Sequence, residues 1–142
     1  MVYLDTSALA KWYLNEPNSG EFVAWLQTQG DLRISSLTEV EMRCLLARRV
    51  RNRELDEALS QQIFATFQDD VAQGQLILSS VEDAWFGDAL NLISTLHPLP
   101  LRTLDALHLA IARGIGVTGV ASADTGMLNA AERMGLDVVR FD

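Results

Sequence analysis

Four acidic residues stand at or near the starts of predicted helices, where their carboxylates could share one divalent cation. Asp5 follows the first apolar run of the chain, and Asp124 follows the fourth such run almost directly. Glu41 and Asp105 lie in the first turns of two further helical segments. Carboxylate oxygens suit hard cations such as Mg²⁺ or Mn²⁺. Zinc is disfavoured because no Cys/His pair has the spacing of a zinc site.

Each of the four acids also has a structural interpretation. Asp5 and Asp124 could serve as helix N-caps, and Asp105 could compensate a helix dipole. Glu41 points along an apolar stripe, so its carboxylate needs a cation or hydrogen-bond donors, and Arg48 could be its ion-pair partner. His108 follows Asp105 by one turn and could be a metal ligand, although a packed, hydrogen-bonded histidine is the more common outcome for such a residue.

The elements that must position these residues alternate along the chain. Short apolar runs predict strands at 2–4, 32–35, 76–78, 117–122 and 138–141, and periodic segments predict helices between them. Ser36 to Glu39 reads as a capping box that opens a helix and gives Glu39 a structural role, and Thr103 reads as the cap of another helix. The fold class is therefore α/β, with a parallel sheet covered on both faces and a functional crevice at the carboxyl ends of the strands.

Composition limits the class of protein. The 142 residues are 49% hydrophobic and carry a formal net charge of −8, so we expect one globular domain and no bulk attraction to nucleic acid or anionic lipid. The most apolar window, Leu104 to Ala123, is too polar and too interrupted by glycine to span a membrane, and no secretory signal is expected because Asp5 comes so early. The lone Cys44 has no internal disulfide partner, which fits a cytoplasmic protein.

Four sequence blocks resemble the motifs of PIN-domain ribonucleases, and within that superfamily those of VapC-type toxins of type II toxin–antitoxin systems. They are Tyr3 to Leu9, Thr38 to Arg43, Leu101 to Ala110 and Ser122 to Asp124. The resemblance runs through the whole chain in the family's order, so it implies one PIN domain over residues 1–142. It also implies a three-layer α/β/α sandwich with a mostly parallel sheet of four to five strands. One departure is Thr125-Gly126, where many relatives carry a basic residue.

The resemblance further implies a Mg²⁺-dependent endoribonuclease, with Mn²⁺ as a possible substitute, acting on structured RNA such as tRNA or rRNA. A VapB-like antitoxin would silence it, and the early helices would form the antitoxin groove and a homodimer contact. By motif match, the catalytic and metal-binding acids are Asp5, Glu41, Asp105 and Asp124, supported by Thr6 and Ser122.

In the mechanism that we expect, one or two ions activate a water for in-line attack on a phosphodiester. Asp5, Asp105 and Asp124 are the main ligands, and Glu41 acts directly or through water. Basic residues near the site are candidates for RNA binding, although a solvated helix face would explain several of them equally well. These candidates are Lys11, Arg43, Arg48, Arg49 and Arg102.

Other functions fit less of the sequence. A phosphatase with Asp5 as nucleophile would need a second acid where Ser7 stands, and a lysine near a later strand, whereas Lys11 is the only lysine. A non-catalytic PIN module that binds RNA or protein would be favoured by a missing acid, and none is missing. A housekeeping RNA-processing nuclease without an antitoxin is distinguished from a toxin by gene neighbourhood.

Overall fold

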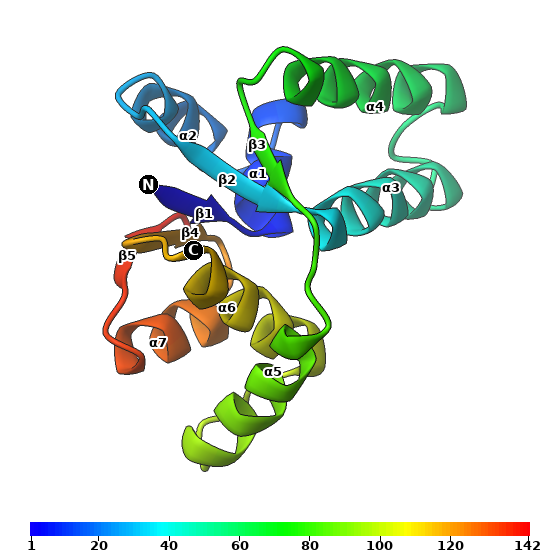
Figure 1. The fold of residues 1–142 in the computed structure, drawn as a ribbon. Helices are drawn as coiled ribbons and strands as arrows, with labels where there is room; N and C mark the ends of the chain where they lie inside the picture. Colours follow the sequence, from blue (N-terminus) through cyan, green and yellow to red (C-terminus); the bar gives the residue numbers. More distant parts are fainter.

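A computed structural model describes all residues from 1 to 142 as five strands and seven helices (Figure 1). In chain order the elements are β1 (Val2–Leu4), α1 (Thr6–Tyr13), α2 (Ser19–Leu26), β2 (Leu32–Ser35), α3 (Ser36–Arg51), α4 (Glu57–Ala72), β3 (Ile77–Ser79), α5 (Ala84–Thr95), α6 (Thr103–Ile115), β4 (Gly119–Ser122), α7 (Thr125–Arg133) and β5 (Asp137–Arg140). A membrane span would need a longer run of apolar residues than any of these helices provides.

The five strands form one sheet in the order β3-β2-β1-β4-β5, and every neighbouring pair is parallel. The predicted α/β class is confirmed, and the sheet is fully rather than mostly parallel. Val2 of β1 is in register with Leu32 of β2 on one side and with Gly119 of β4 on the other. Strands β2 and β3 lie on one side of β1, and β4 and β5 lie on the other. The strand order therefore reverses at β1, and a crevice is expected at the carboxyl end of this central strand.

Two apolar cores lie on opposite faces of this sheet. Tyr3 belongs to the core beneath α5, α6 and α7, whereas its neighbour Leu4 belongs to the core beneath α1 and α2. Successive side chains of a strand point to opposite faces, which explains this division. Both residues are fully buried. The sheet is thus the middle of three layers, with α6 and α7 on one side and α1 and α2 on the other (Figure 1).

Two predicted helix starts are wrong by one residue. The capping box of α3 uses Ser35 and Thr38, because the backbone of Ser35 is still extended and its N–H donates to Thr38 Oγ1 at 3.3 Å. Glu39 therefore has no part in the box. Arg102, not Thr103, occupies the N-cap position of α6, and α6 continues past residue 112 to end at Gly116, whose φ of 84° suits glycine.

Candidate active site

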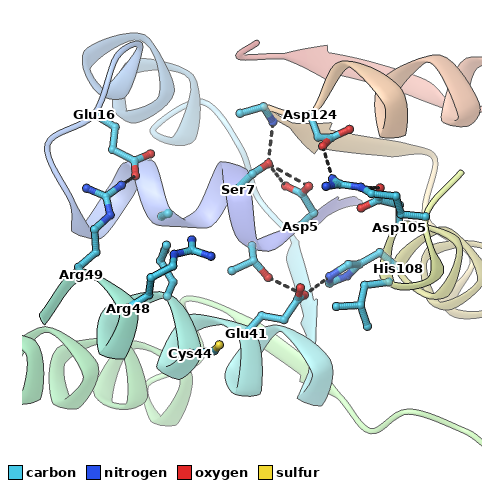
Figure 2. A pocket seen from close by; sticks show the side chains of 16 residues that line it. Asp5, Ser7, Glu16, Glu41, Cys44, Arg48, Arg49, Asp105, His108 and Asp124 are labelled. Carbon is cyan, nitrogen blue, oxygen red and sulfur yellow. Dashed lines mark hydrogen bonds and ion pairs between the residues drawn. The ribbon is translucent and has the colours of Figure 1, made fainter. Parts of the chain in front are cut away.

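A cleft of about 510 Å³ opens where β1 and β4 end and α3 and α6 begin. All four predicted acids line it (Figure 2). Asp5 follows β1, Glu41 lies on α3, Asp105 lies in the first turn of α6, and Asp124 follows β4. The parallel sheet therefore brings together carboxylates from four separate parts of the chain.

Asp5 lies at the bottom of this group and is almost fully buried. Its Oδ1 caps α1 by accepting the Ala8 N–H at 2.9 Å, and its Oδ2 accepts the Ser122 hydroxyl at 2.7 Å. Ser7 Oγ lies within 2.9 Å of both carboxylate oxygens. Burial raises the pKa of Asp5 although these hydrogen bonds oppose the rise. A cation at this position would relieve the cost of the buried charge.

Glu41 is held from two sides. Thr6 Oγ1 donates to Glu41 Oε1 at 2.9 Å, and His108 Nε2 is hydrogen-bonded to the same oxygen. The other ring nitrogen of His108 lies 2.7 Å from the hydroxyl of Tyr3, which in turn lies 2.9 Å from Ser35 Oγ. The predicted partner Arg48 is not bonded to Glu41, so the hydrogen-bond donors that its position requires are Thr6 and His108.

These contacts and the burial of the site shift the pKa values of Glu41 and Tyr3. Partial burial alone would raise the pKa of Glu41, but the hydrogen bond and charge of His108, together with Thr6, lower it overall. Burial also raises the pKa of Tyr3, so its phenol stays protonated. Tyr3 and Glu41 contact the two ring nitrogens of His108, one on each side of the imidazole. His108 therefore contacts a cleft carboxylate as a buried, hydrogen-bonded histidine.

Asp105 and Asp124 are joined by an arginine. Arg102 Nε donates to Asp105 Oδ2 at 2.9 Å, and its Nη2 donates to Asp124 Oδ2 at 2.6 Å. Asp124 also caps α7, because its Oδ1 accepts the Met127 N–H at 2.9 Å. Asp5 and Asp124 therefore act as N-caps and line the cleft at the same time, so the structural and functional interpretations of both residues are compatible.

The donor chemistry of the cleft fits a hard divalent cation, since its acids offer carboxylate oxygens. In this arrangement, however, no three acidic, histidine or cysteine side chains come close enough to hold an ion together. The Arg102 guanidinium takes one oxygen from Asp105 and one from Asp124. Side-chain movement, with Arg102 first among the groups that must move, is therefore needed before these residues could share a metal.

The basic candidates separate into different groups. Arg48 and Arg102 line the cleft, and Arg48 points into it without a salt bridge (Figure 2). Arg49 also lines the cleft, but its guanidinium is bound to Glu16 at 2.5 Å. Lys11 is buried, and its ammonium donates to the Pro17 carbonyl at 2.7 Å, which gives it a structural role.

Arg43 lies apart from the acidic cleft. Its guanidinium stacks over the ring of Phe64 from α4, 5.2 Å from the ring centre. Cation–π contacts of this kind tie a helix surface to its neighbour. Arg43 therefore faces the α3–α4 groove, and of the arginines predicted on α3 only Arg48 and Arg49 reach the cleft.

Sequence reasoning missed three residues of this site. Ser7 has no predicted role of its own, yet its hydroxyl accepts the Ala123 N–H at 2.9 Å and so connects the start of α1 to the residue that follows β4. Tyr3 was assigned to no role, although strand alternation places it on the face of His108. Glu16 anchors Arg49 from a loop that the sequence marks only as a break. Each of these contacts joins segments far apart in the chain, so no local pattern indicates it.

The PIN domain family model matches residues 2–133. Ribonuclease VapC47 of Mycobacterium tuberculosis (strain CDC 1551 / Oshkosh) is 30% identical over 141 residues, which cover 95% of this chain and 93% of that protein.

Two solved structures share the fold. The M. tuberculosis toxin VapC20, described as cleaving the sarcin–ricin loop, superposes with a TM-score of 0.72 at 17% identity, covering 92% of this chain and 95% of the other. VapBC2 from Rickettsia felis, bound to a DNA fragment from its promoter, gives a TM-score of 0.70 at 14% identity and full coverage of both chains. At these identities the structures establish the shared fold.

Proposed function

The chain belongs to the PIN domain family, among the VapC ribonucleases, and from this premise we propose that its acidic cleft cleaves RNA with the help of a divalent cation. It is a toxin-type endoribonuclease, as the resemblance of its four sequence blocks implied. The metal requirement, the site residues and the partners are our proposal. We propose that residues 1–142 form one PIN domain and that it acts in the cytoplasm.

The convergence of Asp5, Glu41, Asp105 and Asp124 in one cleft carries this proposal. A bound Mg²⁺ or Mn²⁺ would supply an activated water and would stabilise the leaving oxygen of a phosphodiester. Asp5, Asp105 and Asp124 would hold the ion, and Glu41 would bind it directly or through water.

The other cleft residues set the orientation of these carboxylates. Ser122 and Ser7 fix the rotamer of Asp5, and Thr6 with His108 fixes that of Glu41. Positioned carboxylates lose less freedom when they bind a metal ion, so their partners affect metal affinity without contacting the ion. Thr6 and Ser122 are the supporting residues of this proposal.

Because the chain carries a net charge of −8, RNA binding requires basic side chains near the cleft. Arg48 is our first candidate because its guanidinium lies free in the cleft. An arginine in that position can bind a phosphate with two hydrogen bonds. Structured RNA such as tRNA or rRNA is the substrate class that we propose.

A VapB-like antitoxin is the proposed protein partner, since a structural neighbour is the VapBC2 pair of R. felis. We also propose a homodimer. The support for it lies on α5, where Phe86 and Leu90 are 53% and 68% exposed, rather than on the early helices. Adjacent large apolar side chains in water commonly mark protein contacts. Sedimentation of the free chain at micromolar concentration tests this point, and a strict monomer would refute it.

Total RNA incubated with the purified chain in Mg²⁺ and in EDTA tests the activity. We expect internal cleavage in Mg²⁺, loss of cleavage in EDTA, and recovery when Mn²⁺ is added. Asp5→Asn should abolish cleavage, whereas Asp69→Asn, which changes an exposed acid on α4, should not. Undiminished cleavage in EDTA or by the Asp5→Asn protein would overturn the proposal.

A further inference from the structure

Arg102 makes a two-pronged contact that the proposed reaction does not use. It stands at the N-cap position of α6 with an extended backbone, and it lines the cleft. One nitrogen binds Asp105 in the same helix, and another binds Asp124 at the start of α7. The guanidinium thus joins two elements through the two carboxylates that are proposed to hold the cation.

Little besides these two bonds holds the guanidinium in place. The Arg102 side chain is 75% exposed, whereas those of Asp105 and Asp124 are 14% and 29% exposed. The arginine can therefore leave the carboxylates without opening a cavity or breaking a packed contact. Asp124 would keep its cap bond to the Met127 N–H when that happens. The ion pair can open while the surrounding fold stays unchanged.

The positive charge of Arg102 also reduces the repulsion between the carboxylates of the cleft. Two carboxylates beside the buried Asp5 repel one another unless a positive group lies close to them. A guanidinium meets that need with directional hydrogen bonds, and a divalent cation would meet it with more charge. Arg102 binds the carboxylates of Asp105 and Asp124, and these are the residues that would hold the divalent cation, so the two cations would compete for the same side chains.

We propose that Arg102 is an internal competitor of the divalent cation: it closes the metal-free site across Asp105 and Asp124, and cation binding turns it outward toward RNA. This inference rests on the proposed metal-dependent function. It assigns Arg102 to a switch between two partners, the carboxylates of the empty cleft and a phosphate of bound RNA.

The switch couples two ligands. If RNA phosphate binds the turned-out guanidinium, RNA weakens the competitor and so raises metal affinity, and by reciprocity the metal raises RNA affinity. If the closed ion pair is populated about nine-tenths of the time, metal affinity in the absence of RNA is reduced about tenfold. Removal of the guanidinium should therefore strengthen metal binding and abolish the coupling.

Mn²⁺ titration of the RNA-free protein, followed by the loss of the free-ion electron paramagnetic resonance signal, tests the competition. We compare the natural chain with Arg102→Ala, Arg102→Lys and Arg48→Ala. Arg48→Ala is the matched control, because it removes the same charge from the same cleft without touching Asp105 or Asp124. We expect Arg102→Ala to bind Mn²⁺ about tenfold more tightly than the natural chain, and more tightly than Arg48→Ala. Lysine keeps the charge but lacks the forked donor, so the Mn²⁺ affinity of Arg102→Lys should lie between those of the natural chain and Arg102→Ala.

The outcomes separate this inference from the proposed function. If Asp105→Asn abolishes Mn²⁺ binding but Arg102→Ala binds no more tightly than Arg48→Ala, the metal site stands and the competition is refuted. If none of the proteins binds Mn²⁺ at millimolar concentration, the inference and the metal-dependent function both fall. In a repeat titration, a non-cleavable RNA analogue should tighten Mn²⁺ binding by the natural chain but not by Arg102→Ala. Equal tightening in Arg102→Ala would refute the coupling.

Discussion

His108 and Glu41 are hydrogen-bonded across the cleft although 67 residues separate them in the chain. His108 is in turn hydrogen-bonded to the buried hydroxyl of Tyr3 on β1. The imidazole thus connects the central strand to a cleft carboxylate. The His108 side chain is only 3% exposed, so its ring is packed inside the protein at the edge of the cleft. We interpret His108 as a positioning residue that acts through Glu41.

Replacement of His108 tests this interpretation. We expect His108→Ala to lower the rate of RNA cleavage about 10- to 100-fold, the range found when a partner of a metal ligand is removed. His108→Gln, whose amide can still donate to Glu41, should recover part of the rate. Mn²⁺ affinity measured beside the rate separates a loss of orientation from unfolding. An Ala variant with the full rate would contradict the role.

The buried carboxylate of Asp5 should make stability depend on pH. Its pKa is raised above the ordinary 3.8 by burial, so the folded chain retains this proton to a higher pH than the unfolded chain does. The stability associated with Asp5 is then greatest below that ordinary value and declines as the pH rises through the folded pKa.

Asp5→Asn removes this titration and keeps hydrogen-bonding atoms for Ala8 and Ser122. We expect its unfolding free energy, relative to that of the natural chain, to increase from pH 4 to pH 8 while cleavage is lost. Urea unfolding in metal-free buffer across that range measures the difference. A relative stability that falls with pH would show that the natural carboxylate is not penalised by burial.

The placement of the acids was predictable from the sequence because it depends on topology. Asp5 and Asp124 each follow an apolar run, and parallel strands end at the same edge, so their meeting needed no knowledge of side-chain contacts. The partner of Glu41 was not predictable, because His108 reaches it only after α3 and α6 have packed around the sheet. The start of α3 was also not predictable from local sequence. Ser35 and Ser36 are both suitable N-cap residues, and the position where β2 ends determines that Ser35 takes this role.

Arg48 and Arg49 are neighbours in sequence but should differ in function. Arg49 is bound by Glu16 and by Glu54, whereas Arg48 is free in the cleft. With an inactive Asp5→Asn background, Arg48→Ala should weaken RNA binding and reduce the slope of log affinity against log salt concentration by about 0.7.

Arg49→Ala provides the matched comparison. It should leave the salt slope unchanged and lower the unfolding free energy by up to about 1 kcal/mol, as expected for partly exposed ion pairs. Fluorescence anisotropy at several salt concentrations measures the slopes. The reverse result, a change of slope for Arg49→Ala alone, would place the RNA on the Glu16 side of the cleft.

Two helical glycines give opposite predictions for stability. A Cβ added at Gly114 in α6 would lie 2.2 Å from Trp85 Nε1 in α5, whereas one added at Gly87 in α5 would have no neighbour within 4 Å. The indole ring would have to move to accommodate the first methyl group, so Gly114→Ala should destabilise the chain by about 1–3 kcal/mol. Gly87→Ala should stabilise it by about 0.5–1 kcal/mol, because alanine loses less backbone entropy in a helix. Urea unfolding followed by circular dichroism compares the two, and equal effects would mean that α5 and α6 are not in close contact at Trp85.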